Sequence, residues 1–410
     1  MTPTFLLNCL IGFATAANGP EFELHAVEGE LRVGPLQRID RDGSILLSQG
    51  PALAGDQLVS LKRLGRPLPA WPRTAHAVLH GGDRIVGQPV EVDGPILQFQ
   101  PASFKRMGDA NEEETIRLPL TSLAFLWLLS PQLLDGDRYA AVLGDTRMQD
   151  AVILRNGDVL TGSVISISAK KKEVTLENGT AMRSIDWKQV VGIAFSTQLA
   201  RTRKPVNRYA HAVLQNGDRL TLQDVEARDG VLSGATLYRD RVAIPLIELA
   251  ALDIYQGKAV YLSDLKPLDY QYRTDSGEQY SWSADRSLDR RELQIKSPIG
   301  AQSFDKGIAL HGACKMRYAL DQKYQRFEAI VGLDPILGKK GSVDIHIEVD
   351  GKVTKMGSRE RLTGEAGPWR VNVDVSGGKE MTIVIDWGEG GAVGDVVNWG
   401  DARLIPMRKK

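Results

Sequence analysis

A hairpin pattern recurs four times in the first 255 residues, and it restricts this region to antiparallel β-structure. Each copy opens with a short apolar run and continues into a turn: HAVEGE, HAVLHGGDR, DAVILRNGDV and HAVLQNGDR. Gly and Asn tolerate the positive φ that tight hairpin turns require. The Asn-Gly pairs at 156–157 and 216–217 therefore predict type I′ turns. The four copies begin at His25, His76, Asp150 and His211.

The copies also close alike, which makes each one a candidate folding unit. Residues 116–120, 185–187 and 244–246 read IRLPL, IDW and IPL, and each leads into a stretch of apolar residues. Between opener and closer, apolar and polar residues alternate with the period of half-buried strands. Each unit is predicted to be a small barrel of about five strands. This strand rhythm resembles Sm-like small barrels, with the first unit only partial because it lacks a clear closer.

Longer alternating strands occupy the last third of the chain. Residues 343–349, 371–375 and 381–387 place apolar side chains at every second position, and Asp350-Gly351 and Gly377-Gly378 mark turns. Antiparallel strands with one apolar face must pack against a second sheet. The fold class predicted for the whole chain is therefore all-β: tandem small barrels followed by a β-sandwich.

Four separated motifs in this region resemble the NPCBM family of carbohydrate-binding modules. The motifs are YLSDLKP from Tyr261, FDKGIALHGACKMRYAL from Phe304, RFEAIVGLD from Arg326 and DVVNWGDARLI from Asp395. The resemblance implies a jelly-roll-like sandwich that binds a polysaccharide or other glycan. Modules of this family accompany glycoside hydrolases, but no hydrolase domain is recognisable beside this one. The expected organisation is a signal peptide at 1–17, a partial barrel at 20–70, barrels at 71–130, 131–200 and 205–256, and the module at 257–410.

Sugar recognition requires flat aromatic rings for stacking and planar polar groups for hydroxyls. Trp369 and Trp399 are expected in loops beside glycine, whereas Trp387 continues a strand pattern and is expected in the core. The alternative for each of these groups is structural: a core aromatic, a satisfied histidine or a solvated arginine. The predicted carbohydrate-binding residues are His311, Arg359, Trp369, Asn398, Trp399 and Asp401.

Acidic residues near the glycine-rich turns form a candidate metal site. Oxygen ligands on flexible turns suit calcium, although no EF-hand-like spacing is present. We expect no organic cofactor and consider calcium the one candidate ion. The predicted ligands are Asp386, Glu389 and Asp395.

Several function classes are disfavoured by composition and motifs. The 51 basic and 51 acidic side chains cancel, and this balance argues against a nucleic-acid partner. No metalloprotease, phosphate-loop or nucleophile-elbow motif occurs. Asp83, Asp158 and Asp218 recur at equivalent hairpins, so we interpret them as turn residues rather than catalytic groups.

The N-terminus predicts export. An apolar stretch at 5–13, followed by small residues at 14–17, is typical of a signal peptide and too short to span a bilayer. Cys9 as a lipid-attachment site is the alternative. With the signal removed, Cys314 is the only cysteine, and we expect a buried thiol.

The sequence thus predicts an exported, non-catalytic glycan-binding protein in the periplasm, at the cell surface or outside the cell, with no transmembrane segment. Its N-terminal barrels would serve as spacers or dock envelope proteins. The alternative is a cell-envelope scaffold whose sandwich no longer binds sugar, and a hydrolase with an unrecognised site is a third hypothesis.

Overall fold

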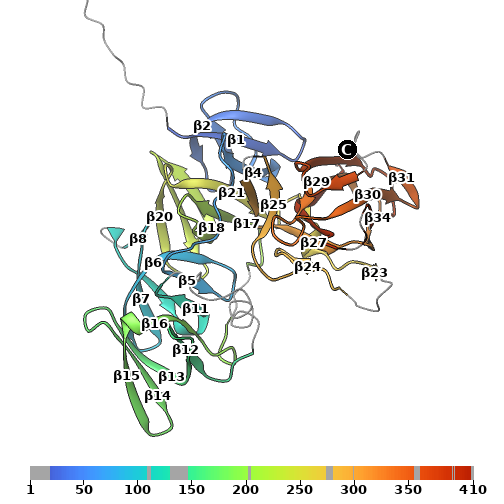
Figure 1. The fold of residues 1–410 in the computed structure, drawn as a ribbon. Helices are drawn as coiled ribbons and strands as arrows, with labels where there is room; N and C mark the ends of the chain where they lie inside the picture. The colour runs from blue at the N-terminus through green and yellow to red at the C-terminus, as the bar shows by residue number, and fades with distance from the viewer. Residues whose placement is uncertain are drawn as a thin grey trace, which may run out of the picture.

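The chain is all-β, as the strand periodicity predicts. The computed structural model describes residues 19–108, 112–129, 146–201, 205–273, 280–298, 300–354, 361–389, 391 and 393–407. An N-terminal β-region, blue to yellow in Figure 1, lies beside a C-terminal sandwich, orange to red. The predicted signal peptide, Cys9 and Arg359 lie outside the described residues. Within the described part, no helix is long and apolar enough to cross a membrane. Its short 3₁₀ helices are η1 (Gly55–Gln57), η2 (Leu120–Ser122), η4 (Trp187–Gln189) and η5 (Leu262–Asp264).

The N-terminal region contains four groups of consecutive strands, which we call units 1 to 4. Unit 1 is β1 (Glu21–Ala26), β2 (Leu31–Ile39), β3 (Ile45–Leu47) and β4 (Leu58–Arg63). Unit 2 is β5 (His76–Leu79), β6 (Arg84–Asp93), β7 (Ile96–Pro101), β8 (Lys105–Met107), β9 (Glu112–Glu113), β10 (Ile116–Pro119) and β11 (Leu123–Trp127). Unit 3 is β12 (Asp150–Leu154), β13 (Val159–Ser168), β14 (Glu173–Asn178), β15 (Ala181–Asp186) and β16 (Val190–Ala194). Unit 4 is β17 (Tyr209–Leu214), β18 (Arg219–Arg228), β19 (Val231–Thr236), β20 (Arg241–Pro245) and β21 (Leu249–Tyr255).

Each unit is a meander whose last strand returns to the first. The returning strands β4, β11, β16 and β21 pair antiparallel with β1, β5, β12 and β17. The same strands join the units in pairs, because β4 also pairs with β21 and β11 with β16. Units 1 and 4, and units 2 and 3, therefore share continuous sheets (Figure 1).

The first hairpin of every unit has the same turn, and it is not the predicted type I′. In unit 3 the amide of Gly157 donates to the carbonyl of Leu154, and the amide of Leu154 donates to the carbonyl of Asp158. Only the glycine has a positive φ, of 89°. These bonds define a type I turn followed by a left-handed residue, the usual three-residue hairpin loop. The other units repeat them at Ala26–Glu30, Leu79–Asp83 and Leu214–Asp218.

Two of the aspartates at these turns also connect units 2 and 4. The carboxylate of Asp83 accepts from the amide and hydroxyl of Thr221 in β18, the latter at 2.7 Å. Asp218 reciprocates by accepting from the amide of Val86 in β6. Burial raises the pKa of both carboxyls, that of Asp218 to about 7. Asp158 has no such contact and remains at the surface, bonded to Asn156.

The C-terminal region is a sandwich of two antiparallel six-stranded sheets with a hairpin at its side. The apolar faces of the two sheets enclose one core, which includes Phe327 and Trp399. One sheet contains β22 (Val260–Tyr261), β24 (Ser283–Ala284), β27 (Gly307–His311), β29 (Tyr324–Leu333), β33 (Trp369–Asp374) and β35 (Val396–Pro406). The other contains β23 (Asp269–Tyr272), β28 (Cys314–Ala319), β30 (Ser342–Val349), β31 (Lys352–Thr354), β32 (Arg361–Thr363) and β34 (Glu380–Trp387). The hairpin is β25 (Leu293–Ser297) and β26 (Gly300–Phe304).

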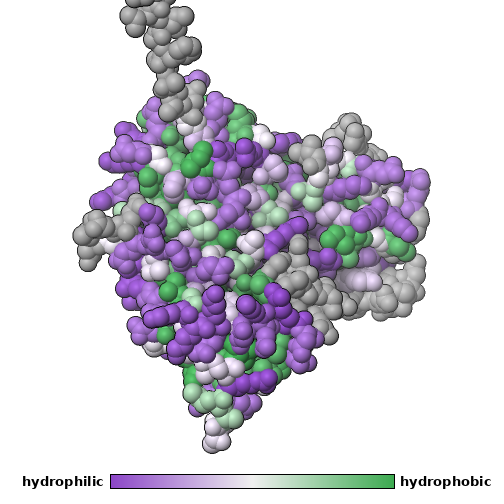
Figure 2. Space-filling view, turned by 60° about the vertical axis from the view of Figure 1, so that its left-hand side comes forward, coloured by the Kyte–Doolittle hydropathy of each residue, from purple (hydrophilic) through white to green (hydrophobic). Residues whose placement is uncertain are grey.

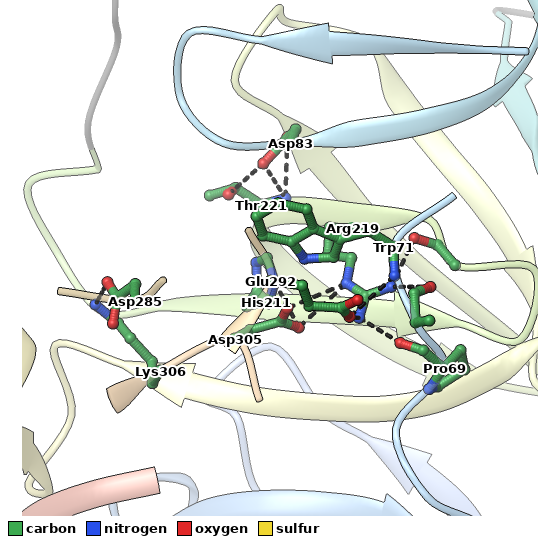
Figure 3. Close-up of polar contacts among 12 residues, drawn as sticks. Pro69, Trp71, Asp83, His211, Arg219, Thr221, Asp285, Glu292, Asp305 and Lys306 are labelled. Carbon is green, nitrogen blue, oxygen red and sulfur yellow. Dashed lines mark hydrogen bonds and ion pairs between the residues drawn. The ribbon is translucent and has the colours of Figure 1, made fainter. Parts of the chain in front are cut away.

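Buried charges join the sandwich to the N-terminal units (Figure 3). The guanidinium of Arg219, in β18, is buried and donates to Asp305 of the sandwich at 3.2 Å. It also donates to the carbonyls of Pro69, Ala70 and Gly217. His211 Nε2 lies 3.5 Å from the same aspartate. Each buried charge here thus has a partner, as an apolar surrounding requires.

Apolar contacts extend this interface. The cluster of Val27, Val59, Ala259 and Ile405 combines residues of unit 1 with the two ends of the sandwich sequence. The outer surface is different: in Figure 2 hydrophilic residues dominate the visible face, and apolar residues appear in small separate groups. Such groups are ordinary for a folded surface and mark no extended apolar patch on this face.

Candidate functional site

Strand ends gather aromatic and charged side chains at one end of the sandwich. Tyr272 ends β23 and pairs in register with Cys314 at the start of β28, which pairs in turn with Ile385 near the end of β34. His311 ends β27 opposite Val396, the first residue of β35. We call the group Tyr272, Arg273, Tyr280, His311 and Trp387 the aromatic end.

Three rings of the aromatic end contact one another. Tyr280 stacks on His311 with ring centroids 4.3 Å apart and an angle of 7° between the planes. Tyr272 meets the same imidazole edge-on at 5.8 Å, and its hydroxyl lies 3.3 Å from Nδ1. Tyr280 as a whole residue remains 41% exposed. Tyr280 therefore offers a flat aromatic surface to solvent, held in place from behind.

Hydrogen bonding defines the protonation of His311. Its Nδ1 lies 2.6 Å from the carbonyl oxygen of Gly312, which can only accept, so Nδ1 carries a proton. Burial lowers the pKa of His311, although the bond to Gly312 opposes this effect. The ring is therefore neutral at pH 7, and Nε2 is left as a hydrogen-bond acceptor.

A second aromatic surface lies at the end of β34. The guanidinium of Arg273 sits 4.8 Å from the ring centre of Trp387 and donates to Asp386 at 2.9 Å. Trp387 was expected in the core, and the structure leaves it half-buried. Stacked cations of this kind hold an aromatic plane in a fixed orientation.

Three predicted sugar ligands belong to the core of the sandwich. Trp399 is fully buried in β35, with its ring 6.1 Å from that of Phe327, and Trp369 begins β33 in the same cluster. The predicted loop at Trp399 is wrong. The neighbouring Gly400 allows close packing rather than a turn, because a Cβ there would lie 2.4 Å from the ring of Phe304. Asn398 is buried as well and donates to the carbonyl of Gln294 at 2.7 Å. The structure thus does not bring these three residues to His311.

Asp401 lies elsewhere, at the junction with unit 1. Its carboxylate accepts from the ammonium of Lys62 in β4 at 2.5 Å. Both residues line a cavity of about 510 Å³ between unit 1 and the sandwich, together with Arg403. Of the predicted sugar ligands in the described part of the chain, only His311 lies at the aromatic end.

The three predicted calcium ligands do not converge. Asp386 pairs with Arg273, and Glu389 accepts from Arg361 at 2.7 Å. Asp395 is buried, and its Oδ1 accepts from the amide of Ser342 at 2.9 Å. Burial raises the pKa of Asp395 to about 6, against the effect of that bond, and Oδ2 has no hydrogen-bond partner among the described residues. Within those residues no three His, Cys, Asp or Glu side chains could hold a metal ion.

Sequence reasoning missed Tyr272, Arg273 and Tyr280. A signal was present, because YQYR at 270–273 places two tyrosines and an arginine in one short run. Cys314, next to Tyr272 across the sheet, is buried as expected, and burial raises its pKa to about 12. It is therefore an inert thiol.

One known domain family matches the C-terminal region. The C-terminal region belongs to the class of β-sandwich modules. More specifically, residues 258–405 match the NPCBM/NEW2 domain family. The search of curated proteins found no match.

Solved structures of related modules are similar to parts of the chain. One is a CBM51 module from the family 95 glycoside hydrolase of Clostridium perfringens, in complex with methyl-galactose: 26% identity, 36% of this chain, 99% of that chain, TM-score 0.32. Another comprises the second CBM51 module and INT domains of ZmpB from the same organism, in complex with GlcNAc: 22% identity, 42% of this chain, TM-score 0.33. This chain spans 36% of the length of that ZmpB structure. None of these comparisons supports the Sm-like resemblance of the N-terminal units.

Proposed function

We propose that this chain is an exported, non-catalytic protein that binds glycan at the aromatic end of its NPCBM/NEW2 domain. The observation that carries the proposal is the stack of Tyr280 on His311, which presents a partly exposed ring beside hydrogen-bonding groups. The apolar C–H face of a sugar packs on such a ring, while hydroxyl groups bond to polar neighbours. The family match supports the same function, because NPCBM modules are expected to bind carbohydrate.

The chemistry available at the aromatic end suits a neutral sugar. His311 Nε2 can accept from a hydroxyl, and the guanidinium of Arg273 has further N–H donors beyond the one bonded to Asp386. Among the described residues, the carboxylates of Asp386 and Glu389 are each bonded to an arginine. This arrangement favours binding over hydrolysis, which requires an acid and a nucleophile on facing carboxyl groups.

Isothermal titration calorimetry on the whole chain tests the site. The probes are methyl-galactose, N-acetylglucosamine and a panel of neutral polysaccharides. We expect Tyr280→Ala to weaken binding about two- to tenfold, because one aromatic stacking contact contributes about 0.5–1.5 kcal/mol.

A matched control is available at the opposite end of the sandwich. Tyr324 begins β29 opposite Pro406, whereas β29 ends beside Val397 at the aromatic end. Tyr324→Ala should leave sugar affinity unchanged. Equal effects of the two substitutions would contradict the site, and absence of binding to every probe would contradict the function.

The burial of Trp369, Asn398 and Trp399 favours a second candidate function. In this case the three residues stabilise the core and bind no sugar, and the sandwich belongs to a cell-envelope scaffold. Under this alternative the N-terminal units recruit envelope proteins, and capture experiments with the intact chain would give the same partners for the wild type and Tyr280→Ala.

A further inference from the structure

A cavity of about 440 Å³ lies in the N-terminal region, away from the sandwich. It forms where unit 2, the segment leaving unit 3 and unit 4 meet. Unit 2 contributes Arg117 from β10, the connecting segment contributes Arg201, and the β19–β20 turn of unit 4 contributes Tyr238 and Arg239. The volume lies within the range of small-molecule sites.

Three guanidinium groups line this cavity. Arg117 is held in place by Asp240, to which its Nε and one terminal nitrogen donate at 3.1 and 2.8 Å. Arg201 and Arg239 are exposed, and within the described residues neither has a side-chain hydrogen bond or ion pair. The acidic groups nearby are already engaged: Asp240 by Arg117 and Asp83 by Thr221. The cavity therefore has an excess of positive charge.

The backbone at Arg239 differs from that of the first hairpin in each unit. The β19–β20 turn has the same pair of bonds, from Arg239 to Thr236 and from Thr236 to Asp240. Its left-handed position, which is glycine in the first hairpin of every unit, is here occupied by Arg239 with φ of 74°. A residue with a side chain is strained there, as Arg290 is in the same kind of turn of the sandwich.

Tyr238 also lines the cavity, although only 7% of the residue is exposed. Its hydroxyl oxygen is enclosed by protein atoms, so it adds no hydrogen-bonding group to the cavity wall.

We propose that this cavity binds an oxyanion, namely a carboxylate, sulfate or phosphate group, through Arg117, Arg201 and Arg239. Guanidinium forks match the oxygen spacing of these groups and bind them with charge-assisted hydrogen bonds. The group is carried either by an acidic polysaccharide or by a small free anion. This site is independent of the sugar site at the aromatic end, because it draws on the N-terminal units alone.

Calorimetry on the whole chain at low salt tests the proposal with four probes: sulfate, glucuronate, polygalacturonate and dextran sulfate. Arg239→Gly is the diagnostic variant, since glycine suits the left-handed turn and folding is not at risk. Arg290→Gly is its matched control, because Arg290 occupies the same kind of turn in the sandwich with φ of 66°. Arg201→Gln provides a second, independent variant.

We expect Arg239→Gly and Arg201→Gln each to weaken oxyanion binding about tenfold, the usual effect of losing one charge-assisted hydrogen bond. Arg290→Gly should bind like the wild type. Binding of the polymers alone would identify an acidic polysaccharide as the source, whereas binding of sulfate or glucuronate as well would identify a free anion. Affinity unchanged in both cavity variants, or no binding of any probe, would overturn the proposal, and methyl-galactose titrations would still report separately on the aromatic end.

Discussion

Replacing Arg219 by Met should destabilise the folded chain by about 3–5 kcal/mol, the usual effect of breaking a buried ion pair from one side. The structure places this guanidinium at 2% exposure, with donors to Asp305 and to three backbone carbonyls. Methionine fills similar volume but satisfies none of these acceptors. The carboxylate of Asp305, itself only 9% exposed, would then retain the imidazole of His211, with Nε2 at 3.5 Å, as a neighbour.

Because of the pKa of Asp305, the stability loss caused by Arg219→Met should depend on pH. Burial raises this pKa, but Arg219 and His211 together lower it well below its ordinary value. A carboxyl with a depressed pKa adds stability above the pKa of its unfolded state, near 3.9, and this stability is lost as the pH falls through the folded value. Arg219→Met should therefore lose most stability above about pH 4, and the difference from the wild type should shrink as the pH falls below 4 towards the folded pKa of Asp305.

Urea denaturation gives the free energy of unfolding of the wild type, Arg219→Met, Asp305→Ala and the double variant. These four values form a double-mutant cycle. We expect the double variant to be less destabilised than the sum of the single variants by about 0.5–3 kcal/mol, because neither charge is then left buried alone. Fluorescence reports on the interface directly, since the backbone amide of Trp71 donates to Glu292 beside Arg219. A loss below about 1 kcal/mol for each single variant, with additive effects, would refute the idea that this pair attaches the sandwich.

Two further predictions concern Trp399, which the sequence placed in a loop, and Asp218, which it placed in a turn. Trp399→Ala should destabilise the chain by about 3–5 kcal/mol in the same denaturation assay, as expected for a buried core aromatic, and an effect below about 1 kcal/mol would place the ring outside the core. The folded pKa of Asp218 is about 7, so its contribution to the stability of the fold is full below the unfolded pKa and disappears as the pH rises through 7. The loss amounts to about 1.4 kcal/mol for each unit of difference between the folded and unfolded pKa. Asp218→Asn should therefore lose less stability than the wild type between pH 4 and pH 8. Parallel pH profiles for the wild type and Asp218→Asn would contradict that assignment.

Local alternation and turn chemistry were sufficient to predict an all-β chain and a C-terminal sandwich. They were not sufficient for the sugar site, and Gly400 shows why. A glycine beside Trp399 reads as a loop, but here it admits the ring of Phe304, which is remote in sequence. Tyr280 was missed because its stacking on His311 depends on two strand ends that only the assembled sheets bring together. Periodicity along a single sequence predicts strands, but it does not predict which side chains of distant segments come into contact.

The strand β27 runs from the interface with the N-terminal units to the proposed sugar site. It begins at Gly307, directly after Asp305 and Lys306, and ends at His311. Four strand steps of about 3.3 Å place the two ends of β27 about 13 Å apart. The attachment to the N-terminal units therefore involves Asp305, before the start of β27, whereas the proposed sugar site uses the last residue of this strand. Because the strand is paired along its whole length with β35, it holds the imidazole in a fixed position relative to the interface, and a glycan bound there would be presented at one orientation to the N-terminal units.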